Sequence, residues 1–149
     1  MPVITSIGDL REIARRRVPR AFFDYADRGS YDERTMARNA SDLAAIQFRQ
    51  RVMVDVSQVA TGTTVLGEHW AMPVGIAPTG LMGLFHRDGE IHGARAAQAA
   101  GVPFTLSTMS ICSIEDVRAA VAGNFWFQLY LMRDRGFNES LITRARAAH

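Results

Sequence analysis

The sequence contains no lysine, because all 17 of its basic residues are arginine. A mechanism that needs a Schiff-base lysine therefore cannot be run by this chain alone. Cysteine is almost absent too: Cys112 is the only one, which excludes an internal disulfide and suits a reducing compartment. No apolar run approaches the length of a membrane span, and the first residues do not resemble a secretory signal. These absences predict a cytoplasmic protein.

A strong charge of either sign is also missing. The formal net charge is +2, and the only basic cluster is Arg15–Arg17 with Arg20. At the end of a short helix such a cluster is typical of a solvated face that complements the helix dipole. We therefore expect no nucleic-acid partner. The 149 residues, 48% of them hydrophobic, instead indicate an ordinary globular chain that can bury a core.

Residues 1–48 are predicted to form an N-terminal helical segment. Three helices are expected, each beginning at a typical start signal: Ser6 with Asp9, Pro19, and Ser30 with Glu33. The first should end near Arg16, and the second should stop before Gly29.

Residues 49–149 are predicted to combine short strands with helices. Between residues 52 and 74, glycine and proline punctuate extended stretches, which indicates a floor hairpin. Strands are then expected at 74–78, 102–107 and 125–131, and they alternate with helices at 90–100, 113–123 and 138–148. Three successive βα units imply a parallel sheet with an open edge. A doubly wound sheet tolerates such an edge, whereas a barrel must close it with further strands.

The third predicted strand carries polar groups on one face. Alternation puts Phe125, Phe127, Leu129 and Leu131 on the face toward the helices, and Trp126, Gln128 and Tyr130 on the other. Burial of the amide and the phenol without partners would cost about 1–3 kcal/mol each. Backbone or water could satisfy them. Their place at the carboxyl end of a parallel strand favours a ligand instead, because active sites of α/β proteins lie there.

The two preceding strands end in similar chemistry. Ser107 ends one of them, although a lone serine is also a common strand terminator or helix cap. The other ends in Pro78, Thr79 and Gly80, where small residues permit a flat ligand to approach the backbone. Together the three strand ends predict a planar ligand that forms hydrogen bonds. The four histidines show no metal-ligand spacing, and Cys112 has no nucleophile signature, so zinc and hydrolase sites are not expected.

Five motifs carry a resemblance to a known family. They are Phe23–Tyr25, Met72–Pro73, Ile76–Gly80, Phe104–Thr108 and Trp126–Tyr130. In order and spacing the chain resembles the FMN-dependent 2-hydroxy-acid oxidases and dehydrogenases, and within them most closely the quinone-linked L-lactate dehydrogenases of bacteria. The resemblance implies an α/β fold, the N-terminal part of a (β/α)8 TIM barrel. About three βα units would follow a short helical segment and a barrel-floor hairpin.

The resemblance also implies roles for individual residues. The backbone of Pro78, Thr79 and Gly80 would lie against FMN, and Ser107 and Gln128 would bond the polar edge of the flavin. Tyr25 would bind the substrate carboxylate and Tyr130 the substrate hydroxyl. Met109 would help line the side-chain pocket, and Gly80, an alanine in glycolate oxidase, favours a dehydrogenase. In the family the catalytic base, a histidine, lies beyond the third strand, so no base is expected in this chain.

The function implied is oxidation of an L-2-hydroxy acid, lactate-like, to the 2-oxo acid. The chain would supply the N-terminal half of the enzyme and be inactive alone. A quinone-type electron acceptor, a homo-oligomer at full length and attachment to the periphery of the inner membrane are further implications. Two alternatives stay open: another flavin-barrel enzyme, such as an isomerase or nucleotide dehydrogenase, and a non-enzymatic half-barrel that assembles with a separate half.

Overall fold

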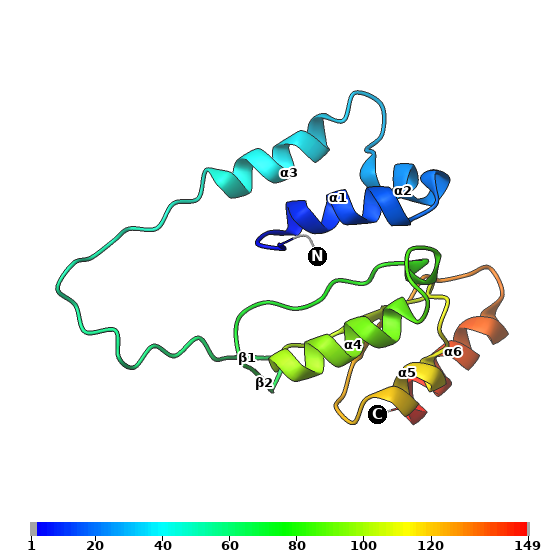
Figure 1. Cartoon of the computed structure of the whole chain (residues 1–149). Helices are drawn as coiled ribbons and strands as arrows, with labels where there is room; N and C mark the ends of the chain where they lie inside the picture. The colour runs from blue at the N-terminus through cyan, green and yellow to red at the C-terminus, as the bar shows by residue number, and fades with distance from the viewer. Residues whose placement is uncertain (1–2, 149) are drawn as a thin grey trace. The chain divides into compact units, whose positions relative to one another are not determined.

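The computed structural model describes residues 3–148. The chain divides into two compact units between Val59 and Ala60. The boundary lies somewhat later than the one expected near Arg49, and the assignment of domains at 1–48 and 49–149 remains a prediction. Figure 1 shows the elements of each unit. Among the described residues, no helix is both long enough and apolar enough to cross a membrane.

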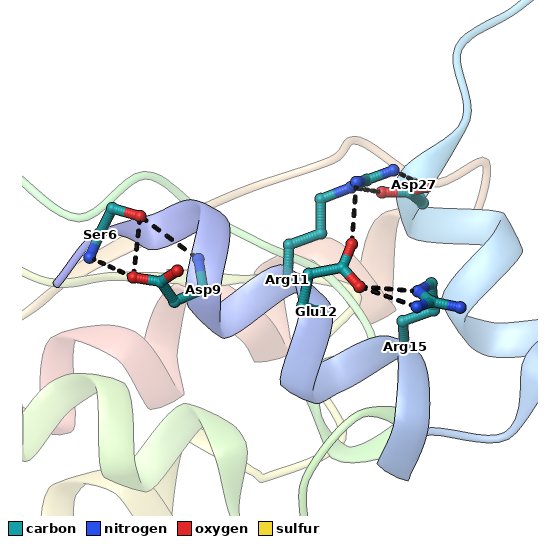
Figure 2. A network of polar contacts seen from close by, with 6 residues as sticks. All are labelled: Ser6, Asp9, Arg11, Glu12, Arg15 and Asp27. Atoms are coloured by element: carbon teal, nitrogen blue, oxygen red, sulfur yellow. Dashed lines mark hydrogen bonds and ion pairs between the residues drawn. The ribbon is translucent and has the colours of Figure 1, made fainter. Parts of the chain in front are cut away.

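The first unit contains α1 (Ile7–Arg17), α2 (Arg20–Asp27) and α3 (Arg34–Ala44). The predicted capping box at the start of α1 is confirmed: the Ser6 hydroxyl accepts from the Asp9 amide, and the Asp9 carboxylate accepts from the Ser6 amide. Arg11 of α1 donates two hydrogen bonds to the Asp27 carboxylate at the end of α2, as Figure 2 shows. This pair ties the two helices together and lowers the pKa of Asp27.

The predicted start of the third helix is wrong. Ser30 lies outside α3, which begins only after Glu33. The backbone at Tyr31 and Glu33 is left-handed, with φ of 54° and 56°, so the chain cannot be helical there. The Glu33 carboxylate turns back instead and accepts from the Gly29 amide at 3.1 Å.

The hairpin predicted between residues 52 and 74 is present in the second unit. Strand β1 (Thr63–Val65) pairs antiparallel with β2 (Glu68–Trp70). Both turn residues between them, Leu66 and Gly67, have positive φ, the conformation that a tight two-residue hairpin requires.

The parallel part consists of β3 (Thr105–Ser107) and β4 (Trp126–Gln128), with Ser107 opposite Gln128. The expected strand at 74–78 is reduced to a single bridge between Ile76 and Phe104. Among the described residues, the backbone bonds across this bridge all involve Ile76: its amide donates to the Pro103 carbonyl, and its carbonyl accepts from the Thr105 amide. Pro103 has no N–H to donate, so the ladder cannot extend toward the amino ends of the two segments.

Four further helices complete this unit: η1 (Met82–Leu84), α4 (Gly89–Ala100), α5 (Ile114–Ala120) and α6 (Arg135–Ala147). Two predicted signals are confirmed, the stop of α4 at Gly101 with φ of 66° and the capping box of Ser113 and Asp116. Helix α6 begins three residues before the expected Asn138, because the Asp134 carboxylate accepts from the Phe137 amide and caps it.

The core lies between the parallel strands and these helices. Its side chains are almost all apolar; the most buried are Leu106, Val117, Ala94, Ala97, Phe104 and Ile114. The helices thereby bury one side of β3 and β4 and hold the carboxyl ends of the two strands next to each other.

Candidate functional site

Ser107 and Gln128 meet at the carboxyl ends of β3 and β4. The register places the two residues opposite each other, and the Ser107 hydroxyl donates to the Gln128 side-chain oxygen at 3.2 Å. The same hydroxyl accepts from the Met109 amide at 3.1 Å, and Ser107 is only 4% exposed. Among the described residues no acceptor meets the Gln128 amide nitrogen, so its two protons remain free to donate to a ligand.

The two faces of β4 divide as predicted. Phe125, Phe127 and Leu129 face α6, where they line a hollow of about 300 Å³ with Ile142 and other α6 residues. Trp126 lies on the opposite face, where its indole N–H donates to Glu68 and its ring packs 5.6 Å from that of Trp70. The hairpin of β1 and β2 therefore contacts Trp126 at the amino end of β4.

Leu131 departs from the predicted division. It was expected against the helices with the other apolar residues of its strand, yet it is 79% exposed. Strand β4 ends at Gln128, so the alternation of faces does not extend to residue 131.

The segment Pro78–Gly80 lies beside the loop that follows β3. The Leu81 amide donates to the Met109 carbonyl at 2.8 Å. A Cβ atom at residue 80 would lie 3.0 Å from the Met109 Cβ, so a larger residue would require Met109 to move. The close approach to Met109 thus explains why a glycine occupies position 80 within this chain. The flat ligand suggested by the sequence is a second explanation.

Thr108 connects the two strands beyond their last paired residues. Its amide and its hydroxyl both donate to the Gln128 carbonyl, and the hydroxyl accepts from the Tyr130 amide at 3.0 Å. Tyr130, with 55% of its surface exposed, is held by its backbone while its side chain remains open. Ser107, Gln128 and Tyr130 are therefore brought together at one edge. Tyr25 lies in α2 of the other unit and is 70% exposed.

Thr108 and Glu90 were missed by the sequence reasoning. Glu90, in the first turn of α4, is completely buried, and one carboxylate oxygen accepts from the Ile111 amide at 2.8 Å in the loop after β3. A glutamate in the first turn of a helix is common on the surface, so no sequence signal distinguished Glu90.

Burial, and then the nearby Glu90, raises the pKa of the Cys112 thiol to about 11. The thiol is therefore neutral and unreactive, as expected of a packed cysteine.

Comparison with known proteins gives consistent matches. The family model described as FMN-dependent dehydrogenase matches residues 14–149. The chain is 58% identical to an L-lactate dehydrogenase of Caulobacter vibrioides over 146 residues and 52% identical to one of Actinobacillus pleuropneumoniae. Each match covers 98% of this chain but only 38% of the relative's length.

Solved structures agree. A soluble mutant of the membrane-associated (S)-mandelate dehydrogenase from Pseudomonas putida superposes with a TM-score of 0.91 at 35% identity, covering 99% of this chain and 42% of that one. A mandelate oxidase superposes with a TM-score of 0.88 at 36% identity, covering 98% of this chain and 42% of that one.

Proposed function

Because the chain belongs to the FMN-dependent dehydrogenase family, we propose that it forms the N-terminal part of a (β/α)8 barrel that oxidises an L-2-hydroxy acid, lactate-like, to the 2-oxo acid. The observation that carries the proposal is the Ser107–Gln128 pair at the carboxyl edge of two adjacent parallel strands. That edge is where barrel enzymes bind their ligands. The names of the relatives, L-lactate and mandelate dehydrogenases, support this class of substrate.

The residues at this edge fit FMN. A flavin has a polar edge of alternating donors and acceptors, and Ser107 with Gln128 offers a hydroxyl and an amide side by side. Their mutual hydrogen bond holds the amide in one orientation, so its free N–H groups are ready to donate. The backbone of Pro78, Thr79 and Gly80 would lie against the ring. When bound, FMN supplies the acceptor for the hydrogen and electrons that leave the substrate.

Two tyrosines are proposed to hold the substrate. The Tyr130 hydroxyl would donate to the substrate oxygen as charge develops on it, and the Tyr25 hydroxyl would donate to the carboxylate. Neither phenol removes the substrate proton. We place the catalytic base, the second carboxylate anchor and the FMN phosphate site in the portion of the relatives that this chain does not cover.

The electron acceptor and the assembly follow from the same proposal. A quinone would reoxidise the flavin, and the full-length protein would form a homo-oligomer. The Pseudomonas putida relative is described as membrane-associated, which supports peripheral attachment to the membrane where a quinone would be reached.

The experiment uses the complete enzyme, meaning this chain joined to the remaining C-terminal portion, taken where needed from the Caulobacter vibrioides relative. The purified protein is expected to be yellow, and anaerobic addition of L-lactate, glycolate or L-mandelate should bleach its flavin absorbance. Turnover with an artificial dye acceptor then ranks the three acids. A flavin-free protein, or a flavin that none of the acids reduces, would overturn the proposal.

A further inference from the structure

The hydroxyl of Thr108 replaces a backbone acceptor just beyond the last paired residues of β3 and β4. In a regular parallel pair, a backbone N–H and a backbone carbonyl of one strand would bond the partner on either side of a residue. Here the last pair is Ser107 with Gln128, and the ladder stops. Beyond it the Thr108 amide still donates to the Gln128 carbonyl, as in a regular ladder, and the Thr108 hydroxyl donates to the same carbonyl. The Tyr130 amide donates to the Thr108 hydroxyl where a regular ladder would offer the Thr108 carbonyl, so the side-chain oxygen replaces the backbone acceptor.

The use of a side-chain hydroxyl as the acceptor in place of a backbone carbonyl has a geometric consequence. A side-chain oxygen lies farther from its own backbone than a carbonyl does, so β4 can be held while the chain after β3 turns away toward Met109. The turn is visible in the bond from the Met109 amide to the Ser107 hydroxyl. Tyr130 is consequently fixed at its amide although it lies outside the regular strand.

We propose that Thr108 is a positioning residue for the reaction: its hydroxyl sets the backbone direction from Gln128 to Tyr130 and so aims the Tyr130 phenol. This inference rests on the proposed function, because it assumes that Tyr130 contacts the substrate. Thr108 itself touches neither substrate nor cofactor in this assignment, and acts only through the backbone of Gln128 and Tyr130.

Threonine variants separate the hydroxyl from the shape of the side chain. Thr108→Val keeps the volume and the β-branch but cannot bond, which leaves the Tyr130 amide without its acceptor. Thr108→Ser keeps the hydroxyl and loses only the methyl group. Thr105→Val is the matched control: it makes the same change three residues earlier, in β3, and among the described residues the Thr105 hydroxyl makes no hydrogen bond.

In the complete enzyme, Thr108→Val is expected to lower kcat for L-lactate by roughly 10- to 100-fold, because a small misplacement of a contacting group has effects of that order. Thr108→Ser should stay within about threefold of the wild type, and the control should be unchanged. FMN content should be retained in all three variants. A double-mutant cycle with Tyr130→Phe gives the readout that a merely structural role would not move: once the phenol is gone, Thr108→Val should have little further effect on kcat.

The outcomes are distinct. Wild-type kcat in Thr108→Val, or full additivity with Tyr130→Phe, overturns the positioning role while leaving the proposed function intact. Loss of FMN and solubility in Thr108→Val, with Thr108→Ser equally impaired, also overturns it, because the hydroxyl alone would then not suffice. A wild-type enzyme that oxidises no 2-hydroxy acid removes the proposed function and this role with it.

Discussion

Single residues at the carboxyl edge owe their positions both to local hydrogen bonds and to bonds that span about 20 residues of sequence. Ser107 is held from both sides, by the Met109 amide and by the Gln128 side chain. Tyr130 is held only at its backbone and presents a half-exposed phenol. This difference suits the proposed roles, since a cofactor needs a rigid bed whereas a substrate must enter and leave.

Tyr130→Phe in the complete enzyme tests the phenol. We expect kcat for L-lactate to fall on the order of 100-fold, as when one donor to a developing negative oxygen is removed, while KM changes little. The reason is that the hydrogen bond strengthens only as charge shifts onto the reacting oxygen. Steady-state kinetics measure both constants, and an unchanged kcat would remove Tyr130 from the site.

Tyr25→Phe should act differently, because a carboxylate carries its charge before and after the chemical step. We expect KM to rise about tenfold, the effect of one hydrogen bond to a charged group, with kcat nearly unchanged. Tyr31→Phe serves as the control, since Tyr31 lies in the same unit, is fully exposed and has no assigned role. Equal kinetics in the two variants would contradict a role for Tyr25 in binding.

At the scale of elements, a bidentate ion pair links α5 to α6. The Arg144 guanidinium donates two hydrogen bonds of 2.7 Å to the Glu115 carboxylate. These bonds lower the pKa of Glu115 to about 2 from an ordinary value of 4.5. A depressed pKa in the folded state means that the pair stabilises the fold above pH 4.5 and loses this effect as the pH falls toward 2.

Arg144→Gln should therefore lower the urea midpoint of unfolding at about pH 6, and the gap to the wild type should narrow at about pH 3. Added salt should also narrow the difference in urea midpoint between Arg144→Gln and the wild type, because both side chains are partly exposed and salt screens their attraction. Arg146→Gln on the same helix is the control, since no ion pair involves Arg146 among the described residues. A gap that is independent of pH would show that Arg144 acts through packing instead.

At the scale of the whole molecule, the second unit has an incomplete surface on the side of β4. Among the described residues only β3 pairs with β4, and the hollow beside it is lined by Phe125, Phe127 and Leu129. The chain spans 38% of the length of the L-lactate dehydrogenases it matches. Further strands of a barrel would pair with this edge and cover these side chains.

The 149-residue chain by itself is therefore expected to show no 2-hydroxy-acid oxidation and only weak FMN binding. The residues proposed to contact the flavin ring belong to this chain. Those proposed to hold the phosphate and the flavin charge lie elsewhere, and charge-assisted bonds are the stronger class. A flavin titration followed by fluorescence and a dye-linked assay with lactate, glycolate and mandelate provide the measurements. Submicromolar binding or measurable turnover would show that this chain carries a complete site.

Much of the local structure could be predicted because its causes lie within a few residues. The capping boxes of Ser6 and Ser113 and the glycine stop at Gly101 are such cases, since each depends on bonds across three to five positions. Prediction failed at the start of α3, where the local sequence signal and the backbone conformation disagree. Ser30 and Glu33 match a helix start, yet the left-handed backbone around Glu33 delays the helix to Arg34.

By itself, the sequence determined the order of the helices, the hairpin of β1 and β2 and the two faces of β4, because side-chain period and turn chemistry are properties of short segments. Only the tertiary structure decided where the strands end and what holds the site. Pro103 accepts from the Ile76 amide but has no N–H with which to extend the ladder, Glu90 becomes buried against the loop at Ile111, and Thr108 bridges to Tyr130. Each of these depends on a partner about 20 residues or more away, and such a partner is specified only once the chain has folded.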